Sequence, residues 1–201
     1  MRSPWGRVYL QTPDDYIWGT NPSGFAREIA ELLPPAARVL ELGCGEGRDS
    51  VFFSCCGCDV IGVDSAETGI QKAKRLARER GASVRWVIAD MAEIDVEGPF
   101  DLVYSCGAVH YVPYADRERL FHFTKSLTRP GGLHGHIAFT DREIYVEFGE
   151  VIDYFLPGEL VGLYAGWTIL VREEGTIDCA QDGTRHRHSV EKLILRRPAD
   201  G

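Results

Sequence analysis

The stretch Val39-Leu-Glu-Leu-Gly-Cys-Gly-Glu-Gly-Arg-Asp-Ser50 decides the fold of this 201-residue chain. It opens with a short apolar run typical of a buried strand, passes through Gly43, Gly45 and Gly47, and continues into a segment expected to be helical. Glycines are needed where the backbone turns sharply and a ligand approaches it more closely than a Cβ would permit. The stretch therefore predicts a nucleotide-binding turn, with a purely structural turn as the alternative.

Acidic residues end the next two predicted strands. Asp64 lies 21 positions after Gly43, close to the roughly 20-residue offset at which a carboxylate reaches a ribose diol. Asp90 is assigned to an adenine amino group, and Met91 to the apolar wall beside the ring. Asp64 also suits a helix cap, a role compatible with binding. Ligand-type residues thus end three successive strands, at the edge where open α/β sheets bind ligands.

The fold class follows from short buried runs that alternate with amphipathic stretches from Arg38 onward, a pattern typical of a parallel sheet. We predict a doubly wound α/β fold whose seven-stranded, mostly parallel sheet ends in an antiparallel hairpin. The expected strands are Arg38–Leu42, Asp59–Val63, Val84–Ala89, Phe100–Ser105, Leu133–Phe139, Thr168–Arg172 and Ser189–Arg196. A polar segment, 173–188, separates the last two.

Helices are expected over 22–33, over 66–80 with Ser65 as N-cap, and within 114–127. Residues 1–21 are rich in Tyr and Trp and are predicted to form an N-terminal arm. The chain is expected to be a single domain, 1–201, in which residues 1–35 cover the site. Tyr9, Tyr16 and Trp18 of the arm would fold over the cofactor, with an ordinary flexible terminus as the alternative.

Composition narrows the function classes. The chain is 44% hydrophobic and 26% charged, which fits one globular domain. No run approaches the roughly 18 apolar residues of a membrane span, and the N-terminus lacks a signal-peptide core, so we expect a cytosolic protein. A net charge of −8 without a basic cluster disfavours nucleic-acid partners. The six cysteines are expected to be reduced thiols.

The ordered motifs resemble those of class I S-adenosylmethionine (SAM)-dependent methyltransferases. The similarity covers roughly residues 36–140 and is carried by 41–47, 63–64, 90–91, 100–105 and 127–133. Within that superfamily, 45–50, 157–160 and 166–167 resemble the tellurite-resistance methyltransferases. Where that subfamily places a His-Arg pair before the last strand, this chain has Asp178-Cys179.

The resemblance implies SAM as cofactor, S-adenosylhomocysteine as product, and methyl transfer to a small molecule such as a chalcogen oxyanion, a thiol or a small metabolite. The residues expected to bind the cofactor are Glu41, Gly43, Cys44, Gly45, Arg48, Asp64, Ser65, Asp90, Met91, Ser105 and Cys106. A non-catalytic SAM-binding regulator remains the alternative. A nicotinamide dehydrogenase is disfavoured because its glycines follow Gly-x-Gly-x-x-Gly, and an aminopropyltransferase because Ser105-Cys106-Gly107 replaces its acidic residue.

Four residues are candidates for work on the acceptor. His110 and Tyr111 follow the fourth strand, where an acceptor pocket should open, although a histidine there also suits a structural hydrogen bond. His186 and His188 share one face of the terminal strand, where they would recognise an anionic acceptor or simply be solvated.

No metal site is predicted. His134-x-His136 and His186-x-His188 suggest one, but no carboxylate pattern completes a ligand set. The cluster of Cys55, Cys56 and Cys58 lacks zinc-site spacing and is interpreted as buried or redox-inert thiols. A further hypothesis is that Cys44, Cys106 and Cys179 together hold a thiophilic substrate such as a metalloid.

Overall fold

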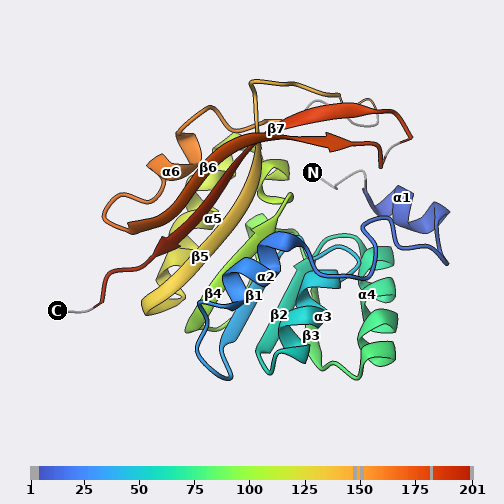
Figure 1. Cartoon of the computed structure of the whole chain (residues 1–201), viewed down its shortest axis with the longest axis horizontal. Helices are drawn as coiled ribbons and strands as arrows, with labels where there is room; N and C mark the ends of the chain where they lie inside the picture. Colours follow the sequence, from blue (N-terminus) through green and yellow to red (C-terminus); the bar gives the residue numbers. More distant parts are fainter. Residues whose placement is uncertain (1–4, 147–148, 150–151, 182, 200–201) are drawn as a thin grey trace.

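The computed structural model describes residues 5–146, 149, 152–181 and 183–199. Its centre is one sheet with the strand order β3-β2-β1-β4-β5-β7-β6 (Figure 1). The strands are β1 (Arg38–Leu42), β2 (Asp59–Asp64), β3 (Val84–Ile88), β4 (Phe100–Cys106), β5 (Thr128–Thr140), β6 (Thr168–Cys179) and β7 (His186–Arg196). Neighbours from β3 to β5 pair in parallel, whereas β7 is antiparallel to β5 and to β6. The predicted fold class is therefore confirmed.

The chain reverses its direction of travel across the sheet at β1. It moves outward from β1 to β2 and β3, then returns to place β4 on the other side of β1. Such a reversal leaves a crevice beyond the carboxyl ends of the two central strands, because their connections leave toward opposite sides. This topology places the ligand crevice beside the loops that follow Leu42 and Cys106.

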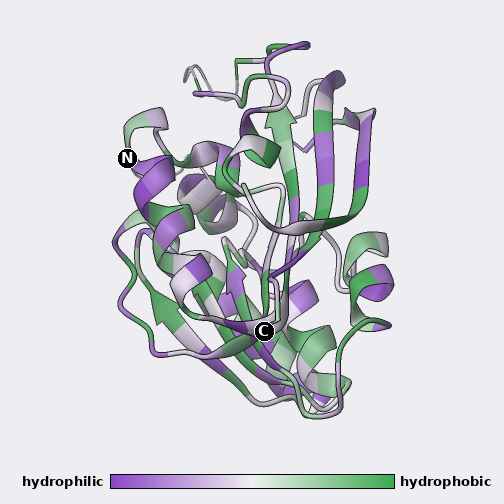
Figure 2. Cartoon of the chain, turned by 90° about the vertical axis from the view of Figure 1, so that its left-hand side faces the viewer, coloured by the Kyte–Doolittle hydropathy of each residue, from purple (hydrophilic) through white to green (hydrophobic). Residues whose placement is uncertain are grey.

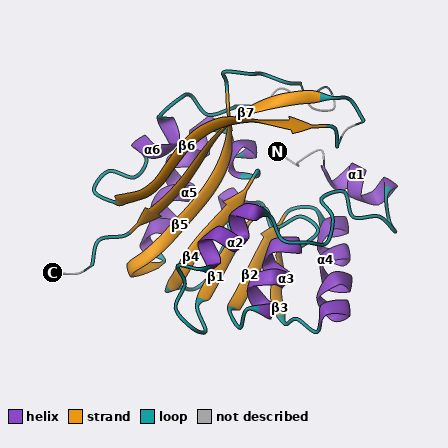
Figure 3. Ribbon diagram, viewed as in Figure 1, coloured by secondary structure: helices purple, strands orange, loops and turns teal. Residues whose placement is uncertain are grey.

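Helices cover both faces of the sheet (Figure 3). They are α1 (Trp5–Gln11), α2 (Gly24–Ala30), α3 (Arg48–Cys55), α4 (Glu67–Arg80), α5 (Tyr114–Ser126) and α6 (Glu159–Gly162), with short 3-10 turns η1 (Met91–Glu93) and η2 (Val109–Tyr111). Phe25 and Ile29 of α2 pack on Val39 on one face, whereas Phe121 of α5 and Leu160 of α6 pack in the cluster on the other. Hydrophilic and hydrophobic residues share the same elements (Figure 2), as expected when one side meets the sheet and the other meets solvent.

Three predicted boundaries need correction. Helix α4 begins at Glu67, and Ser65 is not its cap; instead the Asp64 carboxylate accepts a hydrogen bond from the Ala66 amide at 2.8 Å. Helix α2 is shorter than predicted and is capped by Ser23, whose side chain accepts from the Ala26 amide. The predicted arm contains helix α1, while residues 1–4 of that arm lie outside the described residues.

The terminal hairpin is the largest difference from prediction, because most of the polar segment 173–188 is strand. The last pair between β5 and β7 joins Thr140 to Ser189, but β6 and β7 stay paired beyond it. We call the overhang, residues 177–179 with 186–188, the ribbon tip. Its polar residues resemble a loop in sequence because most of β6 is exposed at the sheet edge. No described helix is long and apolar enough to cross a membrane.

Candidate functional site

The glycine-rich loop after β1 folds across the end of β2. The amides of Gly43 and Cys44 both donate to the Val63 carbonyl, at 2.8 and 2.9 Å. Gly43 has φ +70°, and a Cβ there would lie 2.2 Å from the Cβ atom of Ala108. A Cβ at Gly45 would lie 2.8 Å from the Tyr9 hydroxyl. Both positions therefore require glycine, as a loop that admits close approach demands.

Asp64 joins this loop to the start of α4. One carboxylate oxygen accepts from the Gly45 amide at 2.8 Å and the other from the Ala66 amide at 2.8 Å. Burial raises the pKa of Asp64, while the backbone hydrogen bonds act in the opposite direction. Each carboxylate oxygen has a further lone pair, so the fixed group can still accept from a ligand hydroxyl. The bond to Ala66 lies just before α4, whose N-cap residue is Ala66 and has no side-chain cap, and it is compatible with the predicted ribose contact.

A cavity of about 300 Å³ opens beside Asp64 and the glycine-rich loop. Every predicted cofactor residue except Ser105 lines it. Ser105 is fully buried in β4 and points away from the wall that its neighbour Cys106 helps to form. The lining residues that were not predicted as binding residues are Trp5, Tyr9, Trp18, Glu46, Asp49, Ala89, Gly107, Ala108, Val112, Ile137, Phe139 and Ile177.

Some of these further lining residues could have been identified from the sequence, and others could not. Ala89 and Gly107 adjoin predicted motifs, and Tyr9 and Trp18 belong to the aromatic arm. Ile137, Phe139 and Ile177 lie in the β5 and β6 strands, where an apolar residue normally indicates core. Only the three-dimensional pairing of those strands brings them to the cavity.

The cavity wall is acidic on the loop side. Glu41 accepts a hydrogen bond from the Ser50 hydroxyl, and burial, followed by the nearby Asp49 carboxylate, raises its pKa well above the ordinary value. Glu46 is almost fully buried and forms an ion pair with Lys72 at 2.5 Å. Asp49, Asp64 and Asp90 line the same cavity together with the Arg48 guanidinium, so acidic side chains outnumber basic ones along the wall, which favours a cationic ligand.

Aromatic residues from the N-terminal arm form another part of the wall. Trp5 donates from its indole nitrogen to the Tyr111 hydroxyl at 2.7 Å, and Trp18 donates to the Tyr9 hydroxyl at 3.1 Å. The rings of Trp5 and Trp18 are 4.9 Å apart. Tyr16 does not line the cavity; its hydroxyl donates to the Lys72 carbonyl instead. The arm thus reaches the cavity through two of its three predicted aromatics and through Trp5.

The four residues predicted to act on the acceptor lie in different places in the structure. Tyr111 lines the cavity, but the structure does not bring His110, His186 or His188 to its wall. His110 is fully buried, and its ring stacks on Phe139 with centroids 4.0 Å apart. Burial lowers the pKa of His110 well below its ordinary value, so the ring is neutral at pH 7. His186 and His188 share one face of β7, as predicted, and lie at the ribbon tip.

His134 and His136 form a buried network rather than a metal site. Thr128 and Tyr164 contact the two ring nitrogens of His134, each at 2.7 Å, and Tyr164 also contacts His136 at 2.6 Å. Burial lowers the pKa of both histidines, that of His136 to about 3. With both ring nitrogens already in hydrogen bonds, His134 has no lone pair directed at an ion.

The cysteines fall into three places. Cys44 and Cys106 line the cavity, where burial raises the pKa of both, that of Cys106 to about 11, so both are thiols at neutral pH. Cys179 lies at the ribbon tip and does not line the cavity, so the three do not gather as the metalloid hypothesis requires. Cys55 and Cys56 are exposed rather than buried. Their location at the turn after α3 explains this, because that turn faces solvent.

Comparison with known proteins finds similarity to methyltransferases. A model described as a methyltransferase domain matches residues 39–132. A ubiquinone biosynthesis O-methyltransferase from Xanthomonas axonopodis is 30% identical over 122 residues, covering 60% of this chain and 50% of that protein. The chain spans half or less of the length of the first curated relatives it matches.

Solved structures show the same fold. TehB from Haemophilus influenzae superposes with a TM-score of 0.77 at 22% identity, covering 87% of this chain and 62% of that one. The N-methyltransferase NodS from Bradyrhizobium japonicum, solved with S-adenosylhomocysteine, gives 0.70 at 16% identity, covering 98% and 100%. Residues 39–132 thus match a methyltransferase domain, and in motif order and fold the chain resembles the class I SAM-dependent methyltransferases, TehB among them, whose shared cofactor is S-adenosylmethionine.

Proposed function

We propose that the chain transfers a methyl group from SAM to a small-molecule acceptor. One observation carries the proposal: a single cavity is lined both by the loops after β1 and β2 and by apolar residues of β5 and β6. The cofactor, when bound, supplies a methyl group already activated on a sulfonium. What remains for the protein is to bind, orient and exclude water, and holding two reactants in attack geometry contributes on the order of 7–11 kcal/mol.

The residues beside the glycine-rich loop suit the cofactor. Asp64 is fixed by two amides and keeps lone pairs for a ribose diol. Asp90 accepts from the Ala92 amide at 3.0 Å, so its carboxylate is likewise oriented at the cavity, next to Met91. The acidic wall and the faces of Tyr9, Trp5 and Trp18 favour a positively charged sulfonium. We expect this region to hold the adenosyl and methionyl parts.

The acceptor would meet Tyr111, Ile137, Phe139 and Ile177. Among the described residues, no histidine lines the cavity, and the Cys106 thiol there has a pKa of about 11. A wall without an imidazole base favours an acceptor whose attacking lone pair is already available at neutral pH. A chalcogen oxyanion or an easily ionised thiol has such a lone pair.

Calorimetric titration with SAM and S-adenosylhomocysteine tests the cofactor site. We expect micromolar binding by the wild type and at least about 100-fold weaker binding by Asp64→Ala, since two amides and the ribose lose a charged acceptor. Asp116→Ala removes an exposed carboxylate on α5 and serves as the matched control. Absence of binding by the wild type, or equal binding by Asp64→Ala, contradicts the proposed site.

A non-catalytic SAM-binding regulator is the second candidate, because the same loops would serve it. Formation of S-adenosylhomocysteine with tellurite, selenite or small thiols distinguishes the two. Turnover with any of these acceptors supports the enzyme. Tight cofactor binding without turnover across small-molecule acceptors supports the regulator.

A further inference from the structure

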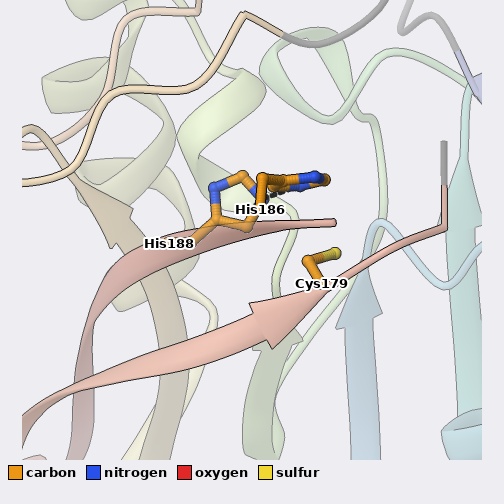
Figure 4. A group of neighbouring side chains, drawn as sticks. All are labelled: Cys179, His186 and His188. Carbon is orange, nitrogen blue, oxygen red and sulfur yellow. Dashed lines mark hydrogen bonds between the residues drawn. The ribbon is translucent and has the colours of Figure 1, made fainter. Parts of the chain in front are cut away.

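We propose that Cys179, His186 and His188 bind a borderline-soft divalent metal ion, for which zinc is the best match. One ligand atom from each of the three side chains lies within 4.8 Å of the others (Figure 4). Thiolate and imidazole are the donors that zinc prefers over the oxygen ligands of calcium or magnesium. The proposal goes beyond methyl transfer and does not depend on it.

The hairpin register holds the three side chains together. Cys179 pairs directly with His186, and Ile177 pairs directly with His188. Directly paired residues of antiparallel strands project from the same face, as do residues two apart on one strand. The three donors and Ile177 therefore share one face of the ribbon tip, and Ile177 lines the cavity. The site is built on regular strands rather than on a loop.

The distances suit a tetrahedral ion. The Nε2 atoms of His186 and His188 are 2.9 Å apart. Two imidazoles on one zinc, with Zn–N bonds of about 2.0–2.1 Å in tetrahedral geometry, would separate the same atoms by about 3.3 Å. The two separations differ by only about 0.4 Å, and the rings meet edge to face.

An outer contact orients one of the ligands. The Nδ1 atom of His186 lies 2.7 Å from the Thr184 carbonyl oxygen. Since a carbonyl only accepts, Nδ1 carries the proton and Nε2 keeps a lone pair on the side of His188, whose Nε2 atom is its neighbour. Metal-binding histidines characteristically use such an outer acceptor to fix their tautomer. The His186 ring also stacks on Tyr145 with centroids 3.6 Å apart, which restricts its rotation.

The ligands proposed here differ from those considered in the sequence analysis, where the two His-x-His pairs suggested a metal site but lacked a complete ligand set. That hypothesis joins two His-x-His pairs, whereas His134 uses both ring nitrogens in hydrogen bonds. Here a cysteine from β6 completes the set, and it meets His186 only because the strands pair far beyond the predicted hairpin. Among the described residues, three protein ligands gather, which leaves a fourth tetrahedral position for water or an external ligand.

Cobalt titration of the reduced full-length chain tests the site. Bound to this ligand set, Co²⁺ should give visible absorption of a tetrahedral ion and a near-ultraviolet thiolate-to-cobalt band, saturating at one ion per chain and abolished by one equivalent of zinc. Cys179→Ser should lose the thiolate band, and Cys179→Ser with His186→Ala should bind Co²⁺ at least about tenfold more weakly. Circular dichroism checks that both variants fold, and both changed side chains are only partly buried.

The surface thiols supply the matched control. Replacing Cys55 and Cys56 by serine removes the two exposed thiols and should leave the spectrum and affinity unchanged. Stoichiometric binding that survives the Cys179/His186 double change, or that disappears in the surface-thiol variant, overturns the proposal. So does a wild type that gives no thiolate band. SAM binding measured alongside is expected to be the same in all variants, which separates this test from that of the proposed function.

Discussion

Two regions of the molecule are built in different ways. The first, which we call the cofactor half, comprises β1 to β4 and the loops that leave them; the second, the hairpin half, comprises β5 to β7. In the cofactor half, cavity residues follow directly on their strands, as Gly43 follows β1 and Asp90 follows β3. In the hairpin half, Phe139 and Ile177 reach the cavity through pairing between distant segments. The proposed cofactor contacts are thus local in sequence, whereas the proposed acceptor contacts depend on strand register.

The sharpest way to break this contrast is to add one methyl group in each half. Gly43→Ala places a Cβ 2.2 Å from Ala108 at φ +70°, so left-handed strain and overpacking should together destabilise the fold by about 2–5 kcal/mol and abolish cofactor binding. Gly175→Ala in β6 meets nothing within 4 Å and should change stability by less than about 0.5 kcal/mol. Denaturant unfolding and calorimetry measure both. Normal cofactor binding by Gly43→Ala would show that the loop is not the binding element.

The halves should also respond to pH in opposite directions. In the cofactor half, the pKa of buried Glu41 is higher in the folded than in the unfolded chain. Its contribution to the free energy of unfolding is therefore fully present below the unfolded-state pKa and is lost as the pH rises through the folded-state pKa. In the hairpin half, burial lowers the pKa of His136 from 6.5 to about 3. Its contribution to the free energy of unfolding is therefore fully present above pH 6.5 and is lost as the pH falls toward 3. Acid should therefore destabilise the hairpin half.

His136→Gln isolates that effect. From pH 6.5 to 5, one histidine that stays neutral when folded reduces the free energy of unfolding by about 2 kcal/mol, because the unfolded chain takes up a proton. Guanidinium unfolding at the two pH values should show a correspondingly smaller loss in the variant. His122→Gln, on the exposed face of α5, is the control and should keep the wild-type pH dependence. An unchanged dependence in His136→Gln would mean that other groups govern the acid response.

The smallest effect is expected at an ion pair that joins β7 to α2, the helix packed against the cofactor half. Lys192 contacts Glu28 at 2.9 Å, but the Glu28 side chain is 41% exposed. Glu28→Gln should therefore lower the free energy of unfolding by less than about 1 kcal/mol, and 1 M salt should remove the difference. Ile29→Ala, one residue on, deletes a fully buried side chain and should cost about 2–5 kcal/mol at any salt concentration. Equal losses for the two variants would contradict the view that apolar packing joins these elements.

The same contrast explains what could be predicted from the sequence. The glycine-rich loop, Asp64 and Asp90 were predictable because each follows a buried run within a few residues, and the parallel order follows from strand and helix alternation. The long β6 and β7 were not predictable, because an exposed edge strand rich in Glu, Thr and Arg has the composition of a loop. For His110, the position after β4 suggested a place at the cavity, but in the structure the ring stacks on Phe139 and does not line the cavity.

The ribbon tip has a consequence for protein engineering. Of the described residues after Phe139, Ile177 alone lines the cavity, and it belongs to an overhang that the β5 edge no longer supports. Exchanging this overhang between homologues would alter the part of the cavity that we propose for the acceptor and would leave unchanged the loops that we propose to bind SAM. A library of variants confined to residues 177–179 and 186–188 is therefore a small library in which to search for new acceptor specificities while the loops after β1 and β2 stay unchanged.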